Sequence, residues 1–337
     1  MSTLIGSIIV FMLVITLHEL GHFTVAKLCG IKVNEFSIGM GPKLLNTTKG
    51  ETLYSLRLLP VGGYVAMEGE EENSNDPRAF NNVNVFKRMA VVVAGVVMNF
   101  LLAVVAFLLV FLMIGVRTNT IDTVLDDSPA KVVGLLESDK VISIGDNTVK
   151  NWNDIIESIS SQKGEFKIVV NRAGKDISFN IIPEERDGRS IIGITPKVEK
   201  SLSNSLGASF NHTLFMIKDV FKTMGMLFTG KAKVSMLAGP VGVINIIGQE
   251  TAKGFINLLN ILGLISANLA VINLLPIPAL DGGKLLFLII ESITGKKLNE
   301  KVENALSLVG LSFLFGIMIY VTIFGDLSRI LNGWCND

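Results

Sequence analysis

The stretch Thr16-Leu17-His18-Glu19-Leu20-Gly21-His22-Phe23 lies inside the first long apolar segment of the chain. On a helix, two histidines four residues apart project from the same face, so both imidazoles can bind one metal ion while Glu19 beside them moves a proton. The alternative is that these are polar residues tolerated near a helix end. Ionisable side chains are costly within a bilayer and usually have a function there, which favours the metal site. The stretch therefore predicts a metal-dependent hydrolytic centre inside a membrane helix.

The composition is that of a membrane protein. Of the 337 residues, 49% are hydrophobic and 18% are charged, whereas about 25% are charged in a typical soluble protein. Thirty basic and thirty acidic residues cancel, so no charge excess indicates a nucleic-acid partner. Two cysteines, Cys29 and Cys335, are too few for a disulfide framework or a cysteine metal cage.

Four apolar runs predict four transmembrane helices, at residues 4–28, 89–116, 255–275 and 305–324. The first is interpreted as a retained anchor, because no basic residue precedes it and His18 and Glu19 stand where a signal peptide would be cleaved. Lys27 and Lys32 follow this run, and a second basic loop precedes the last one. The positive-inside rule then places both termini outside the cytoplasm and the metal site near the cytoplasmic face.

These runs divide the chain into four predicted parts. Residues 1–116 form an N-terminal membrane core, and residues 117–200 form a small α+β domain outside the membrane. Residues 201–254 contain an amphipathic helix, on which His212 lies off the apolar stripe as a surface residue, followed by a gate-like segment that includes residues 234–247. Residues 255–337 form a C-terminal membrane core.

One segment between the first two spans predicts a β-hairpin or a short sheet. Residues 52–65 alternate apolar and polar side chains and contain the turn-forming run Pro60-Val61-Gly62-Gly63. A hairpin this apolar is better placed at membrane depth, covered by protein or a watery cavity, than on a soluble surface. We therefore predict a membrane-dipping hairpin, with a surface hairpin as the alternative.

Two histidines need at least one further protein ligand to form a hydrolytic zinc site. The third span ends at residues 273–283, where two prolines interrupt the helix just before Asp281. The first and third spans run in the same direction, so His18, His22 and Asp281 fall at comparable depth. A turn-forming Asp-Gly is the alternative for Asp281, and Glu291 is the alternative ligand. On the second span, Gly95 and Asn99 predict close helix packing and one interhelical hydrogen bond.

The soluble domain resembles a PDZ domain. The resemblance is carried by Ser128-Pro129-Ala130, by Gly134-Leu135, by the strand at residues 139–144 and by Trp152-Asn153-Asp154. A PDZ groove can accept a peptide as an added strand. A steric filter that binds no peptide is the alternative.

Taken together, the motifs resemble the site-2 protease family of intramembrane zinc metalloproteases, most closely the bacterial regulator-of-sigma-E protease group. They are His-Glu-Leu-Gly-His at 18–22 and the runs at residues 36–39, 60–64, 239–242 and 273–283, in that order. One departure is Gly95-Val96, where family members commonly have Gly-Pro. The fold implied is a polytopic α-helical membrane protein with four transmembrane helices, a membrane-associated β-hairpin and one inserted extracytoplasmic PDZ-like domain.

The same resemblance implies the chemistry and the location. It implies Zn²⁺ bound by His18, His22 and Asp281, with Glu19 as the catalytic base. Further residues would hold an extended substrate, namely Gly62, Gly63, Tyr64, Asn273 and Pro276. The implied reaction is peptide hydrolysis in or near the transmembrane segment of single-span proteins, such as anti-sigma factors or signal-peptide remnants, in the bacterial cell membrane. A non-enzymatic receptor or scaffold that captures exported peptides through the PDZ-like domain is the competing hypothesis.

Overall fold

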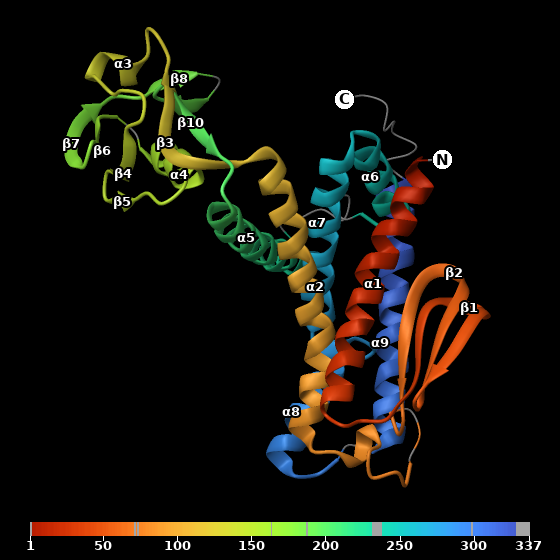
Figure 1. Ribbon diagram of the computed structural model, residues 1–337. Helices are drawn as coiled ribbons and strands as arrows, with labels where there is room; N and C mark the ends of the chain where they lie inside the picture. The colour runs from red at the N-terminus through yellow and green to blue at the C-terminus, as the bar shows by residue number, and fades with distance from the viewer. Residues whose placement is uncertain are drawn as a thin grey trace. The chain divides into compact units, whose positions relative to one another are not determined.

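The computed structural model describes residues 2–70, 72, 74–162, 164–186, 188–230, 238–297 and 299–327. The chain divides into two compact units, of which the first combines Met1–Leu109 with Ser209–Asp337 and the second is Val110–Ala208. Figure 1 shows the first unit as a bundle of long helices and the second as a small mixed domain.

Four helices in the described residues are long and apolar enough to cross a membrane. Most of their side chains are not buried by the protein, as expected of surfaces that face lipid. The four predicted spans are confirmed, although the second helix starts four residues before the predicted run. The four helices are α1 (Ser2–Leu28), α2 (Val85–Ile114), α7 (Phe255–Leu274) and α9 (Glu300–Val321), the last of which continues into a π-helical turn, η3 (Thr322–Leu327).

Two strands between α1 and α2 form a sheet of their own. β1 (Val33–Lys49) pairs with β2 (Thr52–Met67). Each long strand folds back on itself, so residues 33–38 lie between residues 63–67 on one side and residues 53–56 on the other. The prediction of a hairpin confined to residues 52–65 is therefore wrong in extent. Its main partner, β1, was missed because its second half is exposed and shows no burial alternation.

The bends of this sheet depend on glycine. Gly39 has φ +84° and Gly62 has φ +87°, the left-handed region that side chains disfavour. A β-carbon on Gly39 would also lie 2.6 Å from the carbonyl oxygen of Leu59. The fold-back thus brings residues 63–67 to one edge of the sheet.

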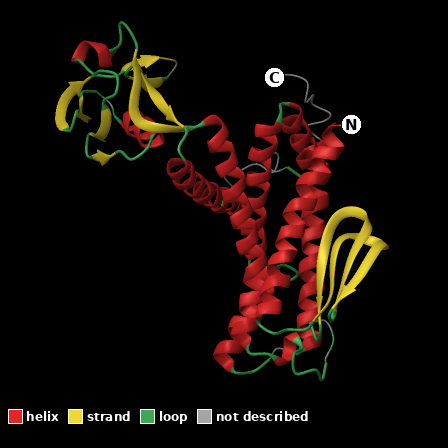
Figure 2. Ribbon diagram, viewed as in Figure 1, coloured by secondary structure: helices red, strands yellow, loops and turns green. Residues whose placement is uncertain are grey.

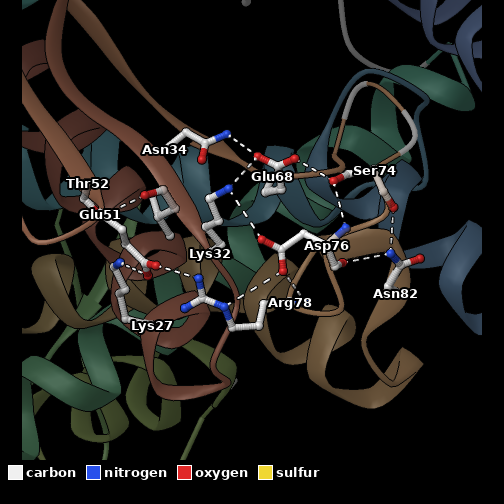
Figure 3. A network of polar contacts seen from close by, with 11 residues as sticks. Lys27, Lys32, Asn34, Glu51, Thr52, Glu68, Ser74, Asp76, Arg78 and Asn82 are labelled. Carbon is white, nitrogen blue, oxygen red and sulfur yellow. Dashed lines mark hydrogen bonds and ion pairs between the residues drawn. The ribbon is translucent and has the colours of Figure 1, made fainter.

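A polar network fixes the sheet to the end of α1 (Figure 3). Lys27 at the end of α1 lies 2.9 Å from Glu51 in the turn between β1 and β2. Glu68, just after β2, accepts hydrogen bonds from Ser74 at 2.6 Å and from Asn34 at 2.9 Å, and these contacts lower its pKa to about 2. The segment that follows β2 is therefore tied to the sheet at its start. A short helical turn, η1 (Phe80–Asn82), leads from this segment into α2.

The C-terminal half of the membrane unit begins with α5 (Leu202–Phe228) and α6 (Pro240–Ala252). Pro240 is the first residue of α6, so the Gly-Pro pair starts a helix rather than interrupting one. Residues 234–237 of the predicted gate-like segment lie outside the described residues. Figure 2 shows α8 (Asp281–Thr294) as a further helix of the unit; it separates α7 from α9 in the chain.

The face that α5 buries is polar and small. Ser209 and Thr213 are fully buried, while Phe210 is 47% exposed. Small residues allow helices in a membrane to pack closely, and the exposed apolar stripe is left for lipid. The prediction that His212 is a surface residue needs correction, because its ring is half-buried and packs edge-on against Phe107 with centroids 4.5 Å apart.

The second unit is an α+β domain whose sheet has the strand order β10-β3-β4-β6-β7, with β5 paired to β4. Its core contains 14 buried residues, among them Trp152. Asp139, 1% exposed, receives two 2.7 Å hydrogen bonds from Arg172. These bonds join the residue before β4 to the end of β6. The strands are β3 (Val116–Val124), β4 (Lys140–Ile144), β5 (Asn147–Thr148), β6 (Phe166–Arg172), β7 (Lys175–Ile181) and β10 (Ile194–Glu199), with a separate hairpin of β8 (Glu184–Arg186) and β9 (Arg189–Ile191), and the helices are α3 (Pro129–Val133) and α4 (Trp152–Ser161).

Candidate active site

Three side chains from distant parts of the sequence converge at one point of the membrane unit. Nε2 of His18 lies 3.1 Å from Nε2 of His22 and 3.1 Å from Oδ2 of Asp281, and Nε2 of His22 lies 3.5 Å from the same oxygen. His18 and His22 are 7% and 9% exposed, and Asp281 is partly buried. The histidines come from adjacent turns of α1, and Asp281 is the first residue of α8.

The three atoms are spaced as zinc ligands are. Tetrahedral ligands about 2.0–2.1 Å from zinc stand roughly 3.3–3.4 Å from one another. Oδ2 of Asp281 is buried and makes no hydrogen bond of acceptable geometry, although both histidine nitrogens are close. A buried acceptor facing two nitrogens that each carry a lone pair is stabilised by a cation between them.

Backbone contact between α1 and α2 sets the depth of the histidines. A β-carbon on Gly21 would lie 2.5 Å from the carbonyl oxygen of Ala94, and one on Gly95 would lie 2.6 Å from Cε1 of His18 and closer still to Nε2 of His22. The sequence indicated only that Gly95 permits close helix packing, and the structure gives it a second role. It leaves the space that both imidazole rings occupy.

The turn before α8 positions Asp281 by backbone contacts as well. β-carbons on Gly282 and Gly283 would clash with the carbonyl oxygens of residues 274–277, and one on Gly310 of α9 would clash with Pro278. Ala279 has φ +82°, a conformation that costs a residue with a side chain about 1–3 kcal/mol and that often marks functional sites. The break between α7 and α8 is thus a tightly packed turn rather than a loose loop.

A cavity of about 620 Å³ opens beside the three side chains. Glu19 lines it, and a β-carbon on Gly63 would lie 3.7 Å from Cγ of Glu19. The edge of the sheet at residues 64–67 forms one wall. The cavity therefore joins the metal cluster, a carboxylate that can move a proton, and a strand edge.

The residues predicted to hold substrate lie in different places. Tyr64 lines the cavity, Gly63 lies beside Glu19 without lining it, and Gly62 forms the preceding bend. Nδ2 of Asn273, at the end of α7, lies 3.3 Å from Nε2 of His18. Pro276 is exposed in the turn before α8 and is not among the residues that line this cavity.

The hydroxyl group of Tyr64 is already engaged. It accepts a 2.5 Å hydrogen bond from Arg57, which also donates to Glu35 at 2.8 Å. Burial, followed by the carboxylate of Glu35, raises the pKa of Tyr64. Tyr64 is thus fixed within the sheet, and its backbone is the part available at the edge.

Glu291, the alternative ligand, is used elsewhere. Its two carboxylate oxygens receive hydrogen bonds from Arg88 of α2 at 2.5 and 3.0 Å. Arg88 is 4% exposed, so this pair joins α2 to α8 inside the protein. In the described residues, Glu291 is not part of the cluster of potential metal ligands.

One ion pair at the cavity was missed from the sequence. Glu70, just after β2, lies 2.7 Å from Nζ of Lys284 in α8, and both residues line the cavity. Its only sequence signal is that Lys284 interrupts the apolar start of α8 three residues after Asp281.

Comparison with known proteins gives the same chemistry. A model of peptidase family M50 matches residues 6–317. A Clostridium acetobutylicum protein that carries a zinc metalloprotease name is 40% identical over 322 residues, covering 94% of this chain and 95% of that protein. Zinc metalloprotease RasP of Bacillus licheniformis is 30% identical over 420 aligned residues, covering 98% of this chain and 100% of the relative. Regulator of sigma-W protease RasP of Bacillus subtilis is 29% identical over 418 aligned residues, covering 98% and 99%.

These matches extend over the membrane helices, the sheet and the inserted unit, and they do not favour a non-enzymatic scaffold. The resemblance drawn from the sequence motifs is confirmed. The chain belongs to peptidase family M50, and it is a site-2-type zinc metalloprotease with several membrane-spanning helices.

Proposed function

We propose that this protease hydrolyses peptide bonds in or next to the transmembrane segment of single-span membrane proteins. The observation that carries the proposal is the cavity in which His18, His22 and Asp281 converge beside Glu19 and a free strand edge, within a unit built from membrane-spanning helices. A soluble protease needs no such location, because its substrates reach it from water.

The chain's own residues divide the chemistry. His18, His22 and Asp281 would hold the zinc ion, which when bound supplies a Lewis acid that polarises the scissile carbonyl and acidifies water. Glu19 takes a proton from the attacking water and returns it to the leaving nitrogen. Asn273, beside His18, has an amide that can donate a hydrogen bond to the carbonyl oxygen of the substrate.

The strand edge at residues 63–67 offers hydrogen-bond partners to the peptide groups of a substrate helix that has unwound. A transmembrane helix satisfies its peptide groups internally, so cleavage requires that it unwind and that the freed groups find new partners. An extended substrate segment added to this edge regains those hydrogen bonds. The edge lies beside Glu19, so the paired segment would also bring its carbonyl groups to the site of hydrolysis.

The basic residues orient the protein in the bacterial cell membrane. Lys27 and Lys32 follow α1, and Lys296, Lys297 and Lys301 surround the start of α9. By the positive-inside rule these ends face the cytoplasm. We place the active site near the cytoplasmic side and both termini outside.

The inserted unit and the substrates complete the proposal. Residues 117–200 act as a PDZ-like domain outside the cytoplasm, which either binds a peptide or excludes bulky substrates. The Bacillus subtilis relative is named for regulation of sigma-W, so anti-sigma factors are the first substrates to test. Signal-peptide remnants, which are also single membrane-spanning segments, are the second.

The test is cleavage of a model single-span substrate by purified protein in bilayer discs. Glu19→Gln is expected to lower the rate at least about 10²-fold, the smaller end of what a general base contributes, while zinc content stays near one ion per chain. Glu157→Gln, an exposed change in α4, is the matched control and should leave the rate unchanged. Full cleavage by Glu19→Gln would refute the assigned base, and undiminished zinc in His18→Ala would refute the metal site.

A further inference from the structure

Asn99 of α2 faces the histidine cluster from within the protein. It is fully buried, and its Nδ2 lies 3.2 Å from Nδ1 of His18. Its Oδ1 is buried and has no hydrogen-bond partner. The hydroxyl of Ser266 in α7 donates a 2.8 Å hydrogen bond to the backbone carbonyl of Asn99, which fixes the backbone at this residue.

The chemistry of imidazole decides which arm of the amide must face His18. A neutral imidazole carries one N–H and one lone pair. Nε2 of His18 points at Asp281 and His22, so a lone pair directed at a metal there leaves the proton on Nδ1. An amide nitrogen cannot accept that proton's hydrogen bond, whereas Oδ1 can. A half-turn of the Asn99 amide exchanges its two arms, which have nearly the same shape, and gives the orphaned oxygen a donor.

The second histidine is oriented from the same helix. Nδ1 of His22 lies 2.8 Å from the backbone carbonyl oxygen of Val91, which can only accept. Nδ1 of His22 therefore carries the proton, and Nε2 is left for the metal. One face of α2 carries Val91, Gly95 and Asn99, which follow one another at intervals of four. This face supplies a hydrogen-bond acceptor for each histidine and, at Gly95, the space in which the two rings lie.

We propose that Asn99 is a positioning residue that accepts a hydrogen bond from Nδ1–H of His18 and so holds Nε2 toward the zinc ion. The inference rests on the proposed function in one respect, namely that His18 is a zinc ligand. Ligating histidines commonly donate their second N–H to a carboxylate, a carbonyl or water, and loss of that partner typically weakens metal binding 10–100-fold.

The first experiment measures zinc affinity of the full chain in bilayer discs by competition with a chelator. Asn99→Leu removes the acceptor at similar size and is expected to weaken zinc binding about 10–100-fold. Asn99→Asp retains an oxygen acceptor and should stay within about threefold of wild type. The matched control is Asn304→Leu, the same substitution at an exposed position of α9, and it should bind zinc as wild type does.

The second experiment reads the histidine tautomer without metal or activity. The chain contains only three histidines, so ¹⁵N-histidine labelling gives three rings that single His→Gln variants assign. The metal-free wild type and Asn99→Asp should show the proton of His18 on Nδ1. Asn99→Leu should show a mixture of tautomers or the proton on Nε2.

The outcomes separate this inference from the proposed function. Wild-type zinc affinity in Asn99→Leu, or a proton on Nε2 of His18 in the metal-free wild type, overturns the role of Asn99. Should Asn99→Leu fail to fold, the tautomer of His18 in the wild type and the zinc affinity of Asn99→Asp still test the role of Asn99. Undiminished zinc binding in His18→Ala overturns the ligand assignment itself.

Discussion

At the scale of single residues, the site depends as much on missing side chains as on those present. Gly21 lets α1 contact the backbone of α2, and Gly95 leaves the space in which the rings of His18 and His22 lie, with their Nε2 atoms 3.1 Å apart. A single ionisable group in a membrane helix is costly, and a group of them is stable only where partners are close. The glycines therefore belong to the site although they carry no chemistry.

Gly95→Ala is expected to weaken zinc binding at least about tenfold, the lower end of the effect of disturbing a metal site's surroundings. The added carbon would overlap the rings of His18 and His22. Alanine is the better helix former by about 1 kcal/mol, so poor helix formation would not explain a loss. Chelator competition measures the effect, with Gly316→Ala in α9, which meets no neighbour within 4 Å, as the control. Equal affinity in the two variants would contradict this account.

At the scale of elements, a partly buried ion pair helps to hold the sheet together and a buried one joins α8 to α2. Glu35 of β1 receives hydrogen bonds from Ser55 at 2.6 Å and Arg57 at 2.8 Å, both in β2. Arg88 and Glu291 join α2 to α8 in the same manner. The sheet that carries the strand edge is thus held together, and α8, which begins at Asp281, is joined to α2, independently of the metal.

The pair at Glu35 should make the sheet sensitive to acid. Burial opposes its charge, but the bonds from Ser55, Arg57 and Tyr64 outweigh burial and lower the pKa of Glu35 from 4.5 to about 2. A depressed pKa stabilises the fold above the unfolded value, and the gain is lost as the pH falls from about 4.5 toward 2. Glu35→Gln should cost about 1.5–3 kcal/mol at pH 7, as expected for hydrogen bonds to a charged group. Thermal unfolding should show the stability difference between the two proteins shrinking below about pH 4.5 and vanishing only near pH 2, and a constant difference would exclude the mechanism.

The pair at Glu291 separates stability from metal binding. Glu291→Gln leaves Arg88 buried without its charge partner and should cost about 3–5 kcal/mol in stability while zinc remains bound. Asp281→Asn should have the opposite effect, with zinc lost and unfolding little changed in metal-free protein. Zinc analysis and thermal unfolding of both variants measure this. Loss of zinc only from Glu291→Gln would reverse the ligand assignment.

At the scale of the whole molecule, the chain is a membrane unit interrupted by a unit with its own core. The interruption falls inside α2 and α5, since the second unit runs from Val110 to Ala208. Its 14 buried core residues all belong to that unit. Such a core is what independent folding requires.

Residues 117–200 expressed alone should therefore unfold in one cooperative transition, with a stability of about 4–12 kcal/mol for a domain of this length. Trp152 is buried in the core and is the only tryptophan in the fragment, so its fluorescence in urea reports the transition. A broad, non-cooperative change would show that the fragment depends on the rest of the chain.

The sequence allowed the spans and the convergence of His18, His22 and Asp281 to be predicted, because bilayer thickness and helix direction restrict where each residue can lie. It did not reveal β1, whose outer half lacks a buried face, or the pairing of Glu70 with Lys284, which depends on a fold-back that local pattern does not encode. For Asn99, the sequence predicted only an interhelical hydrogen bond. The direction of that bond toward His18 depends on the register between α1 and α2, which three dimensions alone determine.

The turn that carries Asp281 also has a consequence for protein engineering. Its shape is set by contacts between backbones at Gly282, Gly283 and Gly310, together with the left-handed Ala279. Side-chain libraries at these positions would mostly yield inactive clones, since no rotamer removes a β-carbon. Diversity aimed at new cleavage preferences belongs on the other wall of the cavity, at Ala66, because the hydroxyl of Tyr64 is bonded to Arg57 and the side chains of Val65 and Met67 pack against the core.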